Sequence, residues 1–203
     1  MIWFTSDTHF GHANAIKFTG RPFESVEDME DVFVKNINSR VKADDVLYHL
    51  GDFSFHTSAD DAKRVRERIH CKNIHLIKGN HDKDWSRPEL IGTFILEPLV
   101  MHIKLDDGGR LACCHFPMLD WPAFRHGSIH LHGHIHSSRE YNLWNRENGD
   151  LRYDVGVDAN DYCPVSLEEI MDFFKGVEYN NRRNWREWKK PPTPQMTHYD
   201  LGN

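Results

Sequence analysis

The chain has 203 residues, a formal net charge of −6 and 39% hydrophobic residues. That length and apolar content suffice for one well-filled domain. The negative charge disfavours a general affinity for nucleic-acid backbones, although a local basic patch could override it. The apolar start at Met1 lacks a basic region and a small-residue cleavage site, and no apolar run approaches the roughly 18 residues that a membrane helix needs. We therefore expect a cytoplasmic protein with no membrane segment.

The first half of the chain alternates apolar runs with helical patterns. We expect a strand over 1–6 and a short helix over 14–18, and Ser25 then caps a helix whose apolar side chains recur at helical spacing up to Val41. The apolar run that ends at Leu50 indicates a short buried strand. A charged helix over 58–69 and a strand over 73–78 follow. This half therefore predicts strand-helix-strand units.

The second half is richer in strands. Strands are expected over 94–96, 99–105 and 110–114, and the turn Asp106-Asp107-Gly108-Gly109 joins the last two as a hairpin. After a strand over 128–132, the polar stretch 141–149 is interpreted as a further hairpin. A strand over 150–157 and a helix capped at Ser166 complete this half. The change of pattern implies two different sheets.

Five expected strands end in residues that commonly bind metal ions. In α/β sheets, binding sites form beyond the carboxyl ends of the strands, so these residues should converge although they are far apart in sequence. The set mixes nitrogen and oxygen donors without a thiolate. It is too large for one ion and fits two transition-metal ions that share a carboxylate. The candidate ligands are Asp7, His9, Asp52, Asn80, His115, His134 and His136.

At these residues the chain resembles the calcineurin-like metallophosphoesterases. Single blocks such as Gly51-Asp52 are weak signals, but five blocks in the family's order, each after an apolar run, are a specific one. The openings over 6–12 and 18–23 are also similar to those of a small group of bacterial and phage phosphoesterases. The matching blocks are Asp7-Thr8-His9, Gly51-Asp52, Gly79-Asn80-His81-Asp82, His115 and Gly133-His134-Ile135-His136.

The resemblance implies an α/β fold, a ligand arrangement and a reaction. The fold is a four-layer αββα sandwich of two mixed β-sheets flanked by helices. A hydroxide held between two metal ions would attack phosphorus. His81 would be catalytic, because in the family this histidine protonates the leaving oxygen or stabilises the charged phosphoryl group. The implied ligands are Asp7, His9 and His136 for one ion, Asn80, His115 and His134 for the other, and Asp52 for both.

The metal and the substrate contacts are less narrowly defined. Imidazole and carboxylate ligands suit Mn, Fe, Zn, Ni or Co, and we expect Mn; Mg alone does not suit four histidine ligands. His12 follows His9 by three residues and is a candidate contact to a substrate phosphate, with the start of a helix as the alternative. Arg21 is the second candidate, since a guanidinium binds phosphate as a planar fork, although a role as a surface residue is more common.

Other polar residues near the motifs have structural explanations. Asp82 could orient His81 or a ligand, or cap the following turn. Asp154 and Asp158 fit turn roles better than metal binding. Two further histidines, His49 and His132, lie inside apolar strands, where a hydrogen-bonded core role is the better interpretation.

These observations predict a phosphoesterase that hydrolyses a small phosphate ester, a phosphodiester such as a nucleotide or cyclic nucleotide. A nuclease acting on DNA or RNA ends is an alternative, supported by the basic and aromatic tail 177–203, which otherwise packs on domain 1–176 or is partly disordered. A non-catalytic metal-binding scaffold is a second alternative. The aromatic loop 116–127 could contact an organic group of the substrate or cap the core. The oligomeric state stays open.

Overall fold

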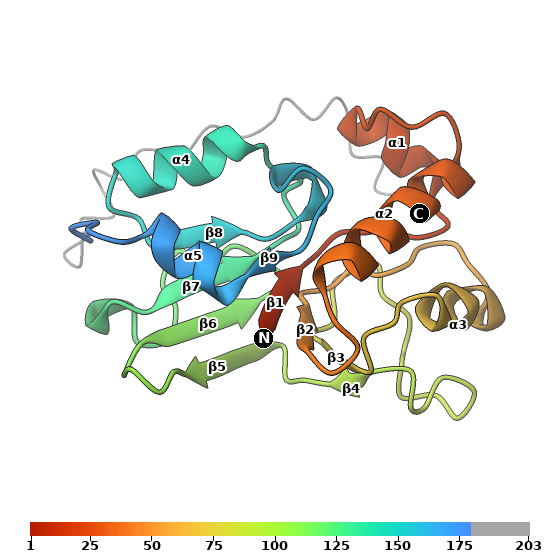
Figure 1. Cartoon of the computed structure of the whole chain (residues 1–203), viewed down its shortest axis with the longest axis horizontal. Coiled ribbons are helices and arrows are strands. Elements are labelled where there is room, and N and C mark those ends of the chain that lie inside the picture. The colour runs from red at the N-terminus through yellow and green to blue at the C-terminus, as the bar shows by residue number, and fades with distance from the viewer. Residues whose placement is uncertain (180–203) are drawn as a thin grey trace.

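The computed structural model describes residues 1–179, which form an α/β sandwich of two mixed β-sheets with five α-helices (Figure 1). The expected fold class is therefore confirmed. The first sheet has the order β4-β3-β2-β1-β9, with β9 antiparallel to β1 and the other pairs parallel. Its strands are β1 (Ile2–Thr5), β2 (Val46–His49), β3 (Asn73–Leu76), β4 (Ile95–Leu96) and β9 (Val165–Ser166).

The second sheet has the order β5-β6-β7-β8, in which β5 and β6 form the predicted antiparallel hairpin and β7 and β8 continue in parallel. Its strands are β5 (Val100–Lys104), β6 (Arg110–Cys114), β7 (Ile129–His132) and β8 (Arg152–Asp154). The helices are α1 (Ala13–Thr19), α2 (Val26–Arg40), α3 (Ala59–Glu67), α4 (Arg139–Glu147) and α5 (Leu167–Phe173). In Figure 1, α2 and α3 lie beside the first sheet and α4 runs along β8.

Two hydrophobic cores hold these layers together. Neighbouring residues of a strand point to opposite faces, so Trp3 packs with Phe33 of α2 in one core, while Phe4 packs with Leu111 and Leu131 of the second sheet in the other. One face of the first sheet thus packs against helices, and its other face packs against the second sheet. This packing aligns the ends of β1, β2, β3, β6 and β7.

The predicted helix starts are confirmed. The hydroxyl of Ser25 accepts a hydrogen bond from the backbone N–H of Asp28 at 3.0 Å and caps α2. Ser166 and Glu169 form a complete capping box at the start of α5. Each side chain therefore satisfies a backbone N–H that the first turn of a helix leaves without a partner.

The hairpin predicted over 141–149 is wrong, because this stretch forms the helix α4. Its buried residues are Tyr141, Asn142 and Asn145, so two of the three are amides and the helix lacks the apolar stripe that helical spacing would reveal. Asn142 is bonded to the backbone of Asp154, donating to the carbonyl at 3.0 Å and accepting from the N–H at 2.7 Å. The helix is attached to β8 by hydrogen bonds as well as by packing.

Two further predictions concern the ends of the chain. The tail predicted over 177–203 falls outside the described residues from position 180 onward, so its role stays a prediction. In the described part of the chain, no helix has both the length and the apolar character needed to cross a membrane.

Candidate metal centre

The seven residues predicted as ligands lie together where strands of both sheets end. The Nε2 atoms of His9 and His136 are 3.2 Å apart, which joins the end of β1 to the loop after β7. Asn80, after β3, places its Oδ1 2.9 Å from His115 Nε2, after β6. The structure brings the following side chains into one cluster: Asp7, His9, Asp52, Asn80, His115, His134 and His136.

Two groups of side chains in this cluster could each hold a metal ion. The ligand atoms of Asp7, His9 and His136 all lie within 4.8 Å of one another, as do those of Asp7, Asp52 and His115. Asp52 also faces both groups, because its Oδ2 is 3.6 Å from His9 Nε2 and 3.4 Å from His115 Nε2. Two carboxylates, Asp7 and Asp52, therefore lie between the histidines.

The backbone of the cluster is strained. Five of its seven residues have a positive φ, a conformation that is unfavourable for residues other than glycine and costs about 1–3 kcal/mol each. Strain of this kind persists where the surrounding structure enforces it, and it concentrates at functional sites. The φ angles are 59° at Asp7, 48° at His9, 57° at Asp52, 72° at His134 and 44° at His136.

Two glycines allow the loops to approach this closely. A Cβ at Gly79 would collide with the carboxylate and the backbone of Asp52, and a Cβ at Gly133 would collide with the carboxylate of Asp7 and the side chain of Ser6. Neither site can take a larger side chain without displacing a candidate ligand. The glycines of the predicted motifs therefore have a steric role beside the ligands.

Burial and charge set the protonation of the first group. Burial raises the pKa of the Asp7 carboxyl to about 6, although the neighbouring histidines oppose this. Burial lowers the pKa of His9 well below its ordinary value, and the charge of His136 adds to the effect. Burial also disfavours the charged form of His136, but its hydrogen bond to Asp158 raises its pKa above the ordinary value. Of the two rings, His136 therefore favours the protonated form more than His9 does.

The second group holds a proton in the same way. Burial disfavours a charged His115, but its contact with the carboxylate of Asp52 raises its pKa to about 9. His115 donates from Nδ1 to the carbonyl of Leu50 at 2.8 Å, so the additional proton lies on Nε2 and faces Asn80 and Asp52. Burial would raise the pKa of Asp52, but the hydrogen bond and charge of His115 hold it below its ordinary value.

The donor set fits divalent metal ions. In both groups imidazole nitrogens and carboxylate or amide oxygens converge, and metal binding to such ligands releases the protons that they carry. His136 bonds Asp158 through Nδ1 and His115 bonds a backbone carbonyl through Nδ1, which directs the Nε2 atom of each ring into the cluster. Burying carboxylates without a cation costs free energy, and a bound divalent ion would lower that cost.

Asp158 and Arg21 hold candidate ligands in position through hydrogen bonds. The Asp158 carboxylate accepts from His136 Nδ1 at 2.7 Å and from Arg21 at 2.7 and 2.9 Å. Burial opposes ionisation of Asp158, but the Arg21 guanidinium holds its pKa well below the usual range. Arg21 also donates to the carbonyl of Asp7 at 2.7 Å, and its side chain is 0% exposed. The predicted contact of Arg21 with a substrate phosphate does not fit this inward position.

Asp82 holds the backbone of the bridging residue. Its carboxylate accepts from the N–H groups of Asp52 at 2.7 Å, Phe53 at 2.9 Å and Gly79 at 2.9 Å. Of the two roles considered from the sequence, it therefore orients a candidate ligand.

Asp158 differs from the turn role that the sequence predicts for it, because its carboxylate contacts His136. The sequence carries no local signal for this contact with a histidine 22 residues away.

His81 and His12 lie beside the cluster and outside the ligand groups. The backbone N–H of His81 donates to Asp52 at 2.9 Å, and its ring centroid is 5.5 Å from that of His9. The His12 ring is 5.7 Å from the His9 ring, and its Nδ1 finds no hydrogen-bond partner within residues 1–179. Burial lowers the pKa of His12 to about 4, so this ring is neutral near pH 7. The catalytic role of His81 and the substrate contact of His12 stay predictions.

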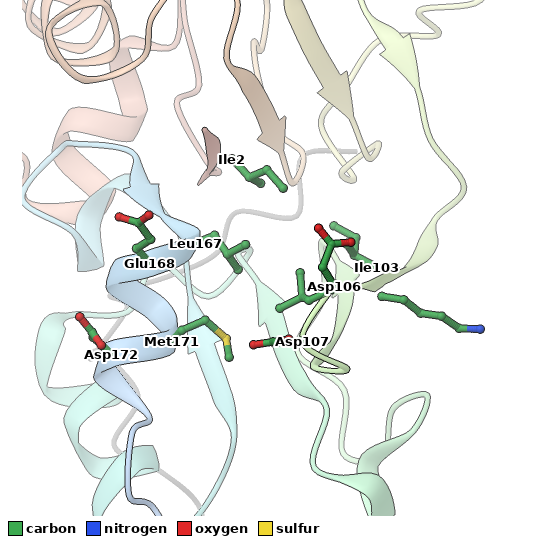
Figure 2. A pocket seen from close by; sticks show the side chains of 10 residues that line it. Ile2, Ile103, Asp106, Asp107, Leu167, Glu168, Met171 and Asp172 are labelled. Carbon is green, nitrogen blue, oxygen red and sulfur yellow. The ribbon is translucent and has the colours of Figure 1, made fainter.

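A groove lies away from the candidate metal centre. A groove of about 550 Å³ opens at the end of the sheets where β1 begins, opposite to the candidate metal centre. Figure 2 shows apolar and acidic side chains along it, and no candidate ligand among them. Its lining includes Ile2, Ile103, Leu167, Met171, Asp106, Asp107, Glu168 and Asp172.

Fold and site together define an α/β sandwich protein with buried Asp and His groups that could bind metal ions. No protein-family model matches the chain. The uncharacterized protein MJ1445 of Methanocaldococcus jannaschii is 34% identical over 174 residues, which cover 84% of this chain and 89% of that protein. The chain belongs to the same family as MJ1445. The Gene 66 protein of Mycobacterium phage D29 is 26% identical, over 87% of this chain and 97% of the phage protein.

Two solved structures are similar. The protein of unknown function AQ665 from Aquifex aeolicus aligns with a TM-score of 0.68 at 29% identity, over 85% of this chain and 98% of that one. The nuclease MPE of Pseudomonas putida aligns with a TM-score of 0.42 at 17% identity, over 68% of this chain and 62% of the nuclease. The first of these supports the fold described above.

Proposed function

We propose that this protein is a dinuclear, divalent-metal-dependent phosphoesterase that hydrolyses a small phosphate ester, with a nucleotide-type phosphodiester as the substrate class. The observation that carries the proposal is the convergence of seven Asp, Asn and His side chains from the ends of five strands, with His81 beside them. The resemblance of these motifs to the calcineurin-like metallophosphoesterases supports the same function.

In this proposal the ligands divide as the resemblance implies. When bound, two divalent ions, manganese first among them, would neutralise phosphate charge and lower the pKa of a water molecule. Asp158 keeps His136 in the correct tautomer, and Asp82 fixes the loop that carries Asp52. The proposed ligands are Asp7, His9 and His136 for one ion, Asn80, His115 and His134 for the other, and Asp52 between them.

His81 is proposed to deliver a proton to the leaving oxygen. It is fixed by its backbone bond to Asp52, and its ring is partly exposed beside His9. General acid catalysis from such a position contributes about 100- to 10,000-fold. His12 lies beside the same ligand and is proposed to contact the phosphate, whereas Arg21 serves by holding Asp158 and the Asp7 backbone.

The proposal is tested by Mn-dependent hydrolysis of bis-p-nitrophenyl phosphate beside p-nitrophenyl phosphate. We expect turnover of the diester that a chelator abolishes, and a loss of about a thousandfold or more in Asp52→Asn, since a bridging carboxylate supports several kcal/mol of stabilisation. His102→Gln, an exposed histidine on β5, is the matched control and should retain full activity.

Metal content separates the outcomes. If the protein binds two ions per chain but hydrolyses neither ester with Mn, Fe, Zn, Ni or Co, the proposal of a small-ester phosphoesterase is wrong and the search turns to DNA and RNA ends. If the protein binds no metal, the enzyme proposal fails altogether and the scaffold alternative replaces it.

A further inference from the structure

Two aromatic rings lie beside the candidate metal centre. Phe55 comes from the loop after β2 of the first sheet, and Phe116 directly follows the candidate ligand His115 at the end of β6 in the second sheet. Each ring contacts histidines of the site, and the two rings reach it from different sheets. Neither side chain has been given a role in the fold or in metal binding.

Phe116 is held in a fixed position although it is exposed. Its ring centroid lies 4.9 Å from that of His115 and 4.6 Å from that of His134, with both pairs edge-to-face. Pro117 follows it and restricts its backbone to extended conformations. The backbone N–H of Met118 donates to the buried His130 at 3.0 Å and fixes the loop. With 42% of its surface exposed, Phe116 presents an ordered apolar ring to solvent at the site.

Phe55 is fixed on the opposite loop. Its backbone N–H donates to the carbonyl of Phe10 at 3.1 Å, next to a bridge between Phe10 and Ser54. Its ring centroid lies 4.3 Å from that of His81 and 4.7 Å from that of His12. The ring therefore borders both residues that are proposed to contact the substrate.

Ordered, partly exposed aromatic rings beside a phosphate-ester site suit a planar ligand. Aromatic pairs contribute about 0.5–1.5 kcal/mol beyond the area they bury, and a ring that is already fixed loses little entropy when it stacks. We propose that Phe55 and Phe116 form a subsite for a planar aromatic group of the substrate, an aryl ring or a nucleobase attached to the phosphate. This inference rests on the proposed phosphoesterase function and narrows its substrate class.

The test uses phosphonates, because their carbon–phosphorus bond is not hydrolysed by a phosphoesterase. Isothermal titration of the Mn-loaded protein compares methylphosphonate, phenylphosphonate and the phosphonate analogue of thymidine monophosphate. We expect the two aromatic ligands to bind about five- to tenfold more tightly than methylphosphonate. The preference should fall to about twofold or less in Phe116→Ala and in Phe55→Ala, whereas methylphosphonate affinity should stay unchanged.

Two variants serve as controls. Phe116→Trp should keep the preference, because it retains a planar ring, and Leu99→Ala removes an apolar side chain that is 64% exposed on another surface and should have no effect. A preference for phenylphosphonate alone assigns the subsite to aryl groups, and a preference for the thymidine analogue assigns it to nucleobases.

Failure of the inference differs from failure of the proposed function. If all three phosphonates bind equally well to the wild type, or if both alanine variants keep the preference, the aromatic subsite is refuted while the phosphate site stands. If the Mn-loaded protein binds none of the phosphonates, the proposed phosphoesterase site is itself refuted, and the subsite with it.

Discussion

Buried histidines inside the strands and buried histidines at the strand ends have opposite kinds of partner. His130, inside β7, donates from Nδ1 to the carbonyl of Ala112 at 2.9 Å and accepts from the N–H of Met118 at 3.0 Å. Both ring nitrogens of this side chain are satisfied by the protein in the neutral form. The second buried histidine of β7, His132, bonds a backbone carbonyl and the hydroxyl of Tyr141.

At the strand ends the ring nitrogens face one another. His9 places Nε2 against Nε2 of His136, and His115 places Nε2 against Asn80 and Asp52. Burial does not distinguish the two regions, since His130 is 0% and His115 1% exposed. The chemical nature of the hydrogen-bond partners distinguishes the two regions. A ring nitrogen that faces other candidate ligands indicates a ligand site, whereas a ring whose two nitrogens both bond backbone or hydroxyl groups has a structural role.

The largest expected effect comes from closing the strand-end region sterically. Gly133→Ala places a Cβ against the carboxylate of Asp7 and the side chain of Ser6, so the two candidate metal groups that share Asp7 should both be disrupted. We expect loss of the ion that Asp7, His9 and His136 are proposed to hold and loss of detectable diesterase activity. The measurement is metal stoichiometry by elemental analysis after dialysis, together with turnover.

The matched control lies in the hairpin beside the groove of Figure 2. Gly109→Ala brings its Cβ against flexible side-chain atoms of Asp107 and Leu105 at 3.0 and 3.1 Å, and should leave metal content unchanged. Wild-type stoichiometry in a folded Gly133→Ala protein would contradict the assignment of Asp7 to the metal centre.

A smaller effect is expected from the support of one ligand. Asp158→Asn keeps an oxygen that can accept from His136 Nδ1, but it removes the negative charge that Arg21 and His136 share. Loss of such an outer partner lowers metal affinity about 10- to 100-fold. Competition with a chromogenic chelator measures this affinity, and Asp107→Asn, in the hairpin turn, is the control. An unchanged affinity for both ions would mean that Asp158 acts on the fold alone.

The sequence predicts the ligands better than their supports, for a physical reason. Asp7, Asp52 and His115 each follow an apolar run directly, so strand pattern and chemistry coincide at adjacent positions. Arg21 and Asp158 are separated by 137 positions, and their pairing exists only after the two loops have packed. Nothing local distinguishes a guanidinium that binds phosphate from one that binds a buried carboxylate.

The same reasoning applies to the fold. Strands β1 to β4 of the first sheet, the helices that pack on it and the β5–β6 hairpin follow from apolar spacing and turn residues, and they are confirmed. Helix α4 does not, because its buried Asn142 and Asn145 carry polar side chains. The two-residue strand β9 is equally hidden, since its pairing with β1 depends on the position of α5 rather than on a pattern of its own. Elements that owe their position to tertiary hydrogen bonds leave no periodic signal.

The smallest effect on the site is expected inside the strands, where His130→Gln should change stability and leave metal binding intact. Burial lowers the pKa of His130 to about 3, whereas a histidine of the unfolded chain titrates near 6.5. As the pH falls below 6.5, the unfolded state binds the proton first, so the native state loses stability until the folded pKa is reached. One such histidine accounts for about 1–3 kcal/mol of that loss by pH 4.

Glutamine does not titrate, so the variant should lose less stability than the wild type between pH 7.5 and pH 4. Urea unfolding of the metal-free protein at a series of pH values measures the difference. Any constant loss from altered packing cancels in this comparison, because only the change with pH is read. His102→Gln, at an exposed position on β5, should retain the wild-type slope. If His130→Gln retained that slope as well, His130 would be accessible to protons in the native state, and the distinction between strand interiors and strand ends would fail at its clearest example.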